Sequence, residues 1–151
     1  MDNKNNDYSI VFSQVQKAYG KNIVINNLNL EIEKGERLIL LGPSGCGKTT
    51  TLRMIAGFEE ITKGDLFMGG ARVNDVAPGE RNIAMVFQSY ALFPHLSVWE
   101  NITFGLQLQK LPQAEIEKRT RQALELLHLE GYETKKTHEL SGGQKQRVAL
   151  C

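Results

Sequence analysis

The 151-residue sequence has few cysteines, no large excess of either charge and no long apolar stretch. Its two cysteines, Cys46 and Cys151, provide neither a disulfide framework nor a metal-binding pair, so we expect a protein of the reducing cytosol. The 18 basic and 17 acidic side chains are balanced, which argues against a protein that wraps a nucleic acid. No apolar stretch comes near the about 20 residues that a membrane-spanning helix requires. Any membrane connection is therefore expected through a partner.

Two kinds of apolar pattern predict strands. Residues 8–12 and 28–32 alternate apolar with polar side chains, which predicts antiparallel strands with one face toward solvent. Residues 37–41 and 83–87 are apolar almost throughout, and this continuity predicts strands that are buried on both faces, as in a parallel sheet. The combination indicates an α/β core joined to an antiparallel β annex.

Helical periodicity and turn residues account for much of the remaining chain. Residues 49–56 predict a helix that ends at Gly57, and residues 113–129 predict a helix with one apolar stripe packed into the core. Residues 141–150 predict the first turns of another helix. A pair of glycines in the middle of residues 65–73 predicts a tight hairpin.

A glycine-rich segment at residues 42–49, GPSGCGKT, matches the phosphate-binding pattern G-x-x-x-x-G-K-[ST] in full. It lies between a predicted strand and a predicted helix, which is the context that this pattern requires. Glycines allow the backbone to turn tightly and to direct successive N–H groups at an anion, while the following helix adds the positive end of its dipole. The segment therefore predicts a site for the phosphates of a nucleoside triphosphate.

The side chains of this loop have separate expected roles. Lys48 supplies a full positive charge for the β- and γ-phosphates, and the hydroxyl of Thr49 can bind Mg²⁺. Cys46 has no histidine near it in the sequence, so we interpret it as a small side chain pointing away from the phosphates and not as a nucleophile. The predicted phosphate-binding residues are Gly42, Pro43, Ser44, Gly45, Cys46, Gly47, Lys48, Thr49 and Thr50.

A second short motif, Leu-Ser-Gly-Gly-Gln, occupies residues 140–144. Ser141 is a favourable helix cap, and the two glycines after it leave the first N–H groups of the helix accessible to an anion. A plain capped junction between a loop and a helix is the alternative interpretation. The presence of a complete phosphate loop in the same chain favours the anion-binding interpretation.

Followed by KQRVAL at residues 145–150, this motif resembles the signature of the ATP-binding subunits of ABC transporters. The resemblance implies that Tyr19 stacks on adenine, although a tyrosine there could also merely close a turn. It implies that Gln88 contacts Mg²⁺ and the attacking water. It further implies two subunits placed head to tail around two ATP molecules, with the signature of one against the γ-phosphate bound by the other. The signature residues concerned are Ser141, Gly142 and Gly143, with Gln144 beside them.

The same resemblance implies partners and a location. Residues 88–106 resemble the surface that receives a transmembrane permease subunit, and the chain is most similar to importers of sugars, polyamines or iron. It would then lie in the cytoplasm, peripheral on the inner face of the plasma membrane, with no nucleic-acid partner. Within that surface we interpret Phe93, Trp99 and Phe104 as buried packing and His95 as an exposed histidine.

The 151 residues do not contain all of this family's catalytic groups. In the family an apolar strand ending in Asp-Glu and a later histidine follow the signature, and neither is present here. We therefore expect these residues to bind ATP without hydrolysing it, and residues 38–41 to lack a neighbouring strand. The expected fold is an incomplete α/β domain over residues 1–151. It would have a P-loop NTPase core, an N-terminal antiparallel β annex and a helical signature region, without its C-terminal part.

Three functions stay open at this point. The first is the energy-coupling ATPase subunit of a membrane importer. The second is a non-hydrolysing ATP-binding module that associates with a full-length homologue, or a decayed fragment. The third is a P-loop ATPase of DNA repair or chromosome organisation, which the lack of zinc-binding cysteine pairs and of heptads between the two motifs disfavours.

Overall fold

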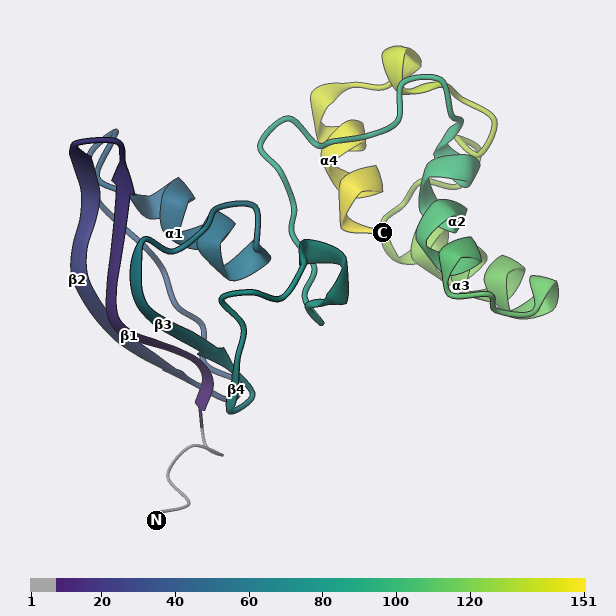
Figure 1. The fold of residues 1–151 in the computed structure, drawn as a ribbon. Coiled ribbons are helices and arrows are strands. Elements are labelled where there is room, and N and C mark those ends of the chain that lie inside the picture. The colour runs from purple at the N-terminus through teal and green to yellow at the C-terminus, as the bar shows by residue number, and fades with distance from the viewer. Residues whose placement is uncertain (1–7) are drawn as a thin grey trace. The chain divides into compact units, whose positions relative to one another are not determined.

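A computed structural model describes residues 8–151 of the protein, which divide into two compact units (Figure 1). The first unit ends at Ala84, and the second runs from Met85 to Cys151. The glycine-rich loop belongs to the first unit, whereas Gln88 and the Leu-Ser-Gly-Gly-Gln motif belong to the second.

The first unit is built on a four-stranded antiparallel sheet in the order β2-β1-β3-β4. The two long strands, β1 (Tyr8–Tyr19) and β2 (Asn22–Glu33), form a hairpin. On its other edge β1 pairs with β3 (Lys63–Met68), which turns back into the short β4 (Ala71–Arg72). This sheet is the antiparallel annex that the alternating patterns predicted.

One helix, α1 (Lys48–Ala56), packs on this sheet (Figure 1). Its Met54 has no exposed surface and lies in one apolar cluster with Phe12 of β1 and Leu66 of β3. Burial of these large side chains is the main stabilising contribution of the unit. The helix ends at Gly57, whose left-handed conformation closes it as predicted.

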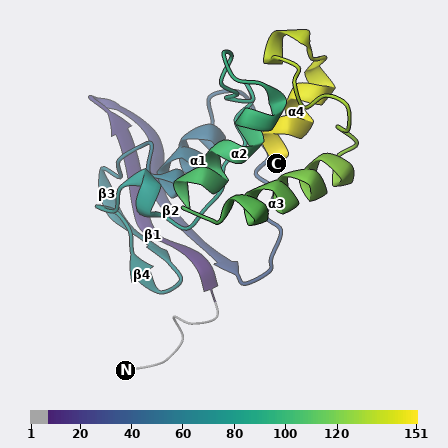
Figure 2. The same cartoon turned by 90° about the vertical axis from the view of Figure 1, so that its right-hand side faces the viewer.

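The second unit is helical. It contains α2 (Val98–Leu108), α3 (Gln113–Leu126) and α4 (Gly142–Leu150), and α2 packs against both of the others (Figure 2). Its buried apolar residues are Val98, Ile102, Leu124, Leu129, Leu140 and Val148. Short 3₁₀ turns occupy Pro78–Glu80 in the first unit and Thr137–Glu139 in the second. None of the helices among residues 8–151 is both long and apolar enough to cross a membrane.

The helices and the hairpin predicted from the sequence are confirmed. Helices predicted at residues 49–56, 113–129 and 141–150 correspond to α1, α3 and α4, with ends that differ by at most a few residues. The hairpin predicted within residues 65–73 is formed by β3 and β4. The apolar stripe of α3 faces inward as expected, since its Ile116, Thr120 and Leu124 are buried.

The prediction that residues 37–41 and 83–87 form strands buried on both faces is wrong. Residues 37–41 and 83–87 are not strands, and the side chains of Ile39 and Leu41 are 77% and 86% exposed. A strand is buried on both faces only when others flank it in a covered sheet, and no strand among residues 8–151 pairs with either segment. Exposure was expected at residues 38–41, and it is confirmed for Leu38, Ile39 and Leu41, while Leu40 is half-buried.

The side chain of Arg81 connects the hairpin to the end of α1. Its Nη1 donates hydrogen bonds to the carbonyls of Met54 (2.6 Å) and Ile55 (2.9 Å), while Nη2 reaches Val73 (2.7 Å) and Nε reaches Val76 (3.0 Å). Partial burial lowers the pKa of this guanidinium, yet the carbonyls around it satisfy its donors. Arg81 thereby holds the segment after the hairpin against α1.

We expect Arg81→Met to lower the free energy of unfolding by about 2–3 kcal/mol, because a charged donor is removed from several half-buried carbonyls. Methionine keeps part of the aliphatic packing. The control is Arg119→Met, which breaks only an exposed pairing with Glu115 on α3 and should leave stability unchanged. Urea titration followed by circular dichroism measures both variants. Equal stability of the two would contradict the role given to Arg81.

Candidate functional site

The glycine-rich loop has a backbone that only glycine adopts without strain at several positions. Gly42, Gly45 and Gly47 have φ angles of +150°, +82° and +93°. Side chains at such angles carry a steric penalty, because the Cβ atom approaches the backbone. The motif glycines therefore determine the path of the loop between residue 41 and α1.

Two of these glycines also lack room for a side chain. A Cβ atom on Gly42 would lie 2.7 Å from Sγ of Cys46, and one on Gly47 would lie 2.9 Å from Cγ1 of Ile25 on β2. A Cβ atom on Gly45 would meet nothing within 4 Å. Gly47 thus lets the loop lie directly against β2, while Gly45 serves the backbone conformation alone.

The ammonium group of Lys48 folds back over this loop. Its Nζ donates hydrogen bonds to the carbonyls of Gly42 and Pro43, each at 2.7 Å, and lies 3.4 Å from Sγ of Cys46. The Lys48 side chain is half-buried, and its charge lies beside the exposed residues 42–46 of the loop. A full positive charge above accessible amides is the arrangement that a polyphosphate requires.

The first turn of α1 has no side chain that caps it. Gly47 occupies the cap position and contributes only its carbonyl, which accepts from the amide and the hydroxyl of Thr51 at 2.8 Å and 3.0 Å. Thr49 is exposed and Thr50 half-buried on the same turn. The leading amides of a helix need acceptors, so the start of α1 provides the donors and the dipole for an anion.

Helices α2 and α4 differ from α1 at this point, whereas α3, which follows Pro112, also has no side-chain cap. Ser97 caps α2 and Ser141 caps α4, each through a capping box in which the side chain three residues later bonds back. In α4, the Gln144 side chain accepts from the Ser141 amide at 2.8 Å, and the Ser141 hydroxyl accepts from the Gln144 amide at 3.3 Å. The predicted role of Ser141 as a helix cap is confirmed.

Tyr19 lies at the end of β1, beside the turn into β2. Its ring is 46% exposed, and it pairs in register with Asn22. Lys17, two residues before it, pairs with Ile25, the residue that contacts Gly47 of the loop. The structure therefore places Tyr19 at the end of the hairpin against which the glycine-rich loop rests.

Lys17 and Glu59 are site residues that the sequence analysis missed. The Lys17 ammonium lies 3.0 Å from the Glu59 carboxylate and 4.7 Å from the centroid of the Tyr19 ring. A hydrogen bond from Lys17 holds the pKa of the Glu59 carboxyl below its usual value. Alternation along β1 puts residues 17 and 19 on one face, which was the available signal for Lys17. No sequence pattern indicated Glu59.

Gln88 and the signature lie in the second unit. Gln88 is exposed and lies within a turn in which the Tyr90 amide donates to the Phe87 carbonyl at 2.9 Å. Gly142, at the start of α4, has the Tyr90 hydroxyl as its nearest neighbour, 3.6 Å from where a Cβ atom would be. The structure thus brings the segment after Gln88 next to the signature glycines.

Two aromatic side chains of residues 88–106 are more exposed than expected. Phe93 and Phe104 are each 39% exposed, and their rings contact one another at a tilt of 51° with centroids 4.7 Å apart. The prediction that they are buried packing is wrong, because both residues are exposed in this unit. Trp99 is half-buried beneath Arg121, and His95 is exposed as predicted.

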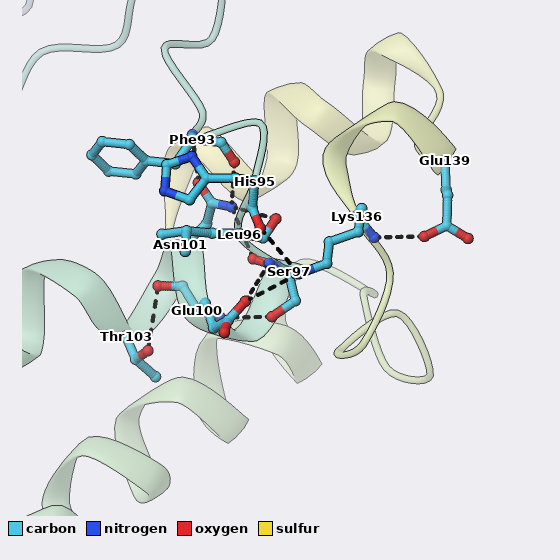
Figure 3. Close-up of polar contacts among 9 residues, drawn as sticks. All are labelled: Phe93, His95, Leu96, Ser97, Glu100, Asn101, Thr103, Lys136 and Glu139. Atoms are coloured by element: carbon cyan, nitrogen blue, oxygen red, sulfur yellow. Dashed lines mark hydrogen bonds and ion pairs between the residues drawn. The ribbon is translucent and has the colours of Figure 1, made fainter.

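A polar network holds the loop that carries Phe93 and His95 (Figure 3). Asn101 accepts from the Phe93 amide at 2.8 Å and donates to the carbonyls of Phe93, Leu96 and Ser97. Lys136 donates to the His95 carbonyl at 3.0 Å. Contacts from α2 and from Lys136 therefore hold this loop and place Phe93 against Phe104 of α2.

A protein-family model described as "ABC transporter" matches residues 25–151, most of the chain. The chain belongs to this family. It is 54% identical over 142 residues to the osmoprotective compounds uptake ATP-binding protein GgtA of Synechocystis sp. It is 57% identical over 130 residues to the oligosaccharides import ATP-binding protein MsmX of Bacillus subtilis. These alignments cover 94% and 86% of the chain but only 39% and 36% of the two relatives.

A solved structure agrees with the fold. The dimeric ATP-binding cassette MJ0796 in a post-hydrolysis state, bound to ADP and Pi, matches with a TM-score of 0.82 at 33% identity. The match covers 93% of this chain and 67% of that one. The α/β fold class and the resemblance stated from the sequence are thus confirmed, and the ADP-bound neighbour supports nucleotide binding.

The two glycines with different surroundings give a matched comparison. We expect Gly47→Ala to lower the thermal stability of the protein more than Gly45→Ala. Both substitutions impose the strain of a left-handed φ, about 1 kcal/mol, but only alanine at 47 also displaces Ile25. Differential scanning calorimetry measures both midpoints. A Gly45→Ala variant as unstable as Gly47→Ala would show that contact with β2 is not what constrains the loop.

Proposed function

We propose that residues 1–151 are the N-terminal portion of one ABC-type ATP-binding domain, which binds ATP in the energy-coupling subunit of a solute importer. The observation that carries this is the loop from Gly42 to Lys48, with its left-handed glycines, its folded ammonium and the uncapped helix behind it. The high identity to importer ATP-binding proteins over nearly the whole chain supports the transport role.

The residues present fit a nucleoside triphosphate with Mg²⁺. The loop amides and the start of α1 would receive the phosphates, and Lys48 would exchange the carbonyls of Gly42 and Pro43 for phosphate oxygens. The exposed hydroxyl of Thr49 would bind the metal ion. For Gln88, which belongs to the second unit, a contact with Mg²⁺ rests on the family resemblance alone. Mg²⁺, when bound, supplies positive charge that neutralises the β- and γ-phosphates.

The signature would serve a second copy of the site. The Ser141 hydroxyl accepts the Gln144 amide, so its own proton is available to donate to a phosphate. Gly142 and Gly143 are exposed at the start of α4 and allow an anion to approach closely. We therefore propose head-to-tail association of two subunits across ATP, which the dimeric state of the solved neighbour supports.

Residues 88–106 would receive a transmembrane permease subunit. The exposed rings of Phe93, on a loop held in place by Asn101, and of Phe104 on α2 together offer apolar surface. Such ordered aromatic surface is typical of a protein interface. The subunit would then be located at the cytoplasmic face of the plasma membrane through that partner.

Within the 151 residues we propose ATP binding without turnover, since their sequence contains no Asp-Glu pair that could supply the catalytic base.

The first test concerns the phosphate loop. We expect Lys48→Ala to weaken Mg-ATP binding tenfold to a hundredfold, roughly the loss of one or two charge-assisted hydrogen bonds. Lys63→Ala removes an exposed lysine of β3 outside the loop and is the matched control. Isothermal titration calorimetry measures both dissociation constants. Unchanged affinity in Lys48→Ala, with the protein folded, would remove the basis of the proposal.

The second test separates capping from association. Ser141→Ala and Ser97→Ala each remove one capping box and each should cost about 1 kcal/mol of stability. Only Ser141→Ala should abolish the dimer that forms with Mg-ATP, because only that hydroxyl would face the second nucleotide. Sedimentation velocity with and without Mg-ATP measures association. ATP-dependent dimers of equal strength in both variants would speak against the role of the signature.

A further inference from the structure

We name Lys17, Glu59 and Tyr19 together the Tyr19 support. The Lys17 ammonium pairs with the Glu59 carboxylate at 3.0 Å and lies over the Tyr19 ring at 4.7 Å from its centroid. Tyr19 is also among the groups that lower the pKa of the Glu59 carboxyl. Lys17 therefore links the carboxylate to the ring.

The two charges of the Tyr19 support are fully partnered. Lys17 is only 7% exposed, and its ammonium also donates to the Glu60 carbonyl at 2.8 Å. The Glu59 carboxylate lies 4.0 Å from Arg53 of α1, and its hydrogen bonds keep the pKa of its carboxyl low, so it stays ionised at neutral pH. A buried lysine requires such partners, because an unpaired ammonium away from water is strongly unfavourable.

The support leaves one face of the Tyr19 ring available. The ammonium occupies one face, while 46% of the residue remains exposed to solvent. Rotation of the ring away from the Lys17 ammonium would lose this cation–π contact. A flat aromatic surface with fixed orientation, at the end of the hairpin that the phosphate loop contacts, is suited to stacking against a nucleobase.

We propose that Lys17 and Glu59 are positioning residues that hold the Tyr19 ring so that its exposed face stacks on the base of the bound nucleotide. This proposal rests on the proposed function, namely that the loop at residues 42–49 binds the triphosphate. Lys17 and Glu59 do not contact the nucleotide. They lower the conformational entropy that the ring loses when the base binds.

The support therefore acts on the base and not on the phosphates. The ammonium of Lys17 is neutralised by Glu59, so it contributes little attraction to the triphosphate. Loss of either residue frees the ring while the loop of Lys48 keeps its own contacts. If Lys17 and Glu59 only position Tyr19, their loss weakens binding of the base and leaves binding of the phosphates unchanged. A general effect on the fold would weaken both.

The experiment compares the affinities of the protein for two ligands. It uses the full chain as the source cells produce it. Dissociation constants for Mg-ATP and for Mg-tripolyphosphate, which has no base, are measured by isothermal titration calorimetry. We expect Glu59→Gln, which keeps the shape of the side chain, to weaken Mg-ATP about fivefold. Tyr19→Ala should weaken it about tenfold or more. Both variants should bind tripolyphosphate within twofold of the unchanged protein.

Two further variants complete the set. In the Tyr19→Ala background, adding Glu59→Gln should weaken Mg-ATP no further, because a positioning residue has nothing left to position. Asp75→Asn, which removes an exposed partner of Arg72 in the same unit, is the matched control and should change neither ligand. Glu59→Gln carries the test because a substitution at the buried Lys17 also loosens β1.

The outcomes separate this proposal from the proposed function. An unchanged affinity for Mg-ATP in Glu59→Gln would overturn the proposal. So would an equal weakening of Mg-ATP and tripolyphosphate, which marks a general structural effect, or additive losses in the double variant. A Lys48→Ala variant that binds both ligands as well as the unchanged protein would instead overturn the proposed function.

Discussion

The left-handed backbone of the loop from Gly42 to Gly47 is the constraint on which the rest of the site depends. Because Gly47 has no side chain, the loop lies against Ile25, and α1 starts directly from it with no capping side chain. The uncapped amides and the folded ammonium of Lys48 follow from that start. Packing of α1 on the sheet through Met54 then fixes the direction of the helix relative to β1 and β2.

Charge is handled differently in the two units. In the first unit, the buried Lys17 is paired with the Glu59 carboxylate and the Glu60 carbonyl. The half-buried Arg81 donates to backbone carbonyls and holds the segment after the hairpin against α1. In the second, Asn101 and Lys136 use polar contacts to order a surface loop that carries exposed aromatic rings. The first arrangement prepares a site for a small anionic ligand, and the second prepares a surface for a larger partner.

Local features of the fold were predictable because they arise from neighbours in sequence. The ends of α1 and α4, the β3–β4 hairpin and the cap at Ser141 follow from glycine conformation, capping and periodicity. The apolar segments 37–41 and 83–87 were wrongly predicted as buried strands, since a continuous apolar run indicates strand burial only where flanking strands exist. The exposure of Phe93 and Phe104 was missed for a similar reason, as aromatic residues are buried only if something covers them.

The sequence by itself determined the phosphate-binding pattern at residues 42–49, the signature at 140–144 and the family to which they point. These signals are continuous in the chain, so residue type and spacing suffice to read them. Only the tertiary structure showed that Glu59, forty residues after Tyr19 in the chain, pairs with the Lys17 ammonium that lies over the Tyr19 ring. Such a contact depends on how α1 and the sheet pack together, and no local pattern of residues encodes it.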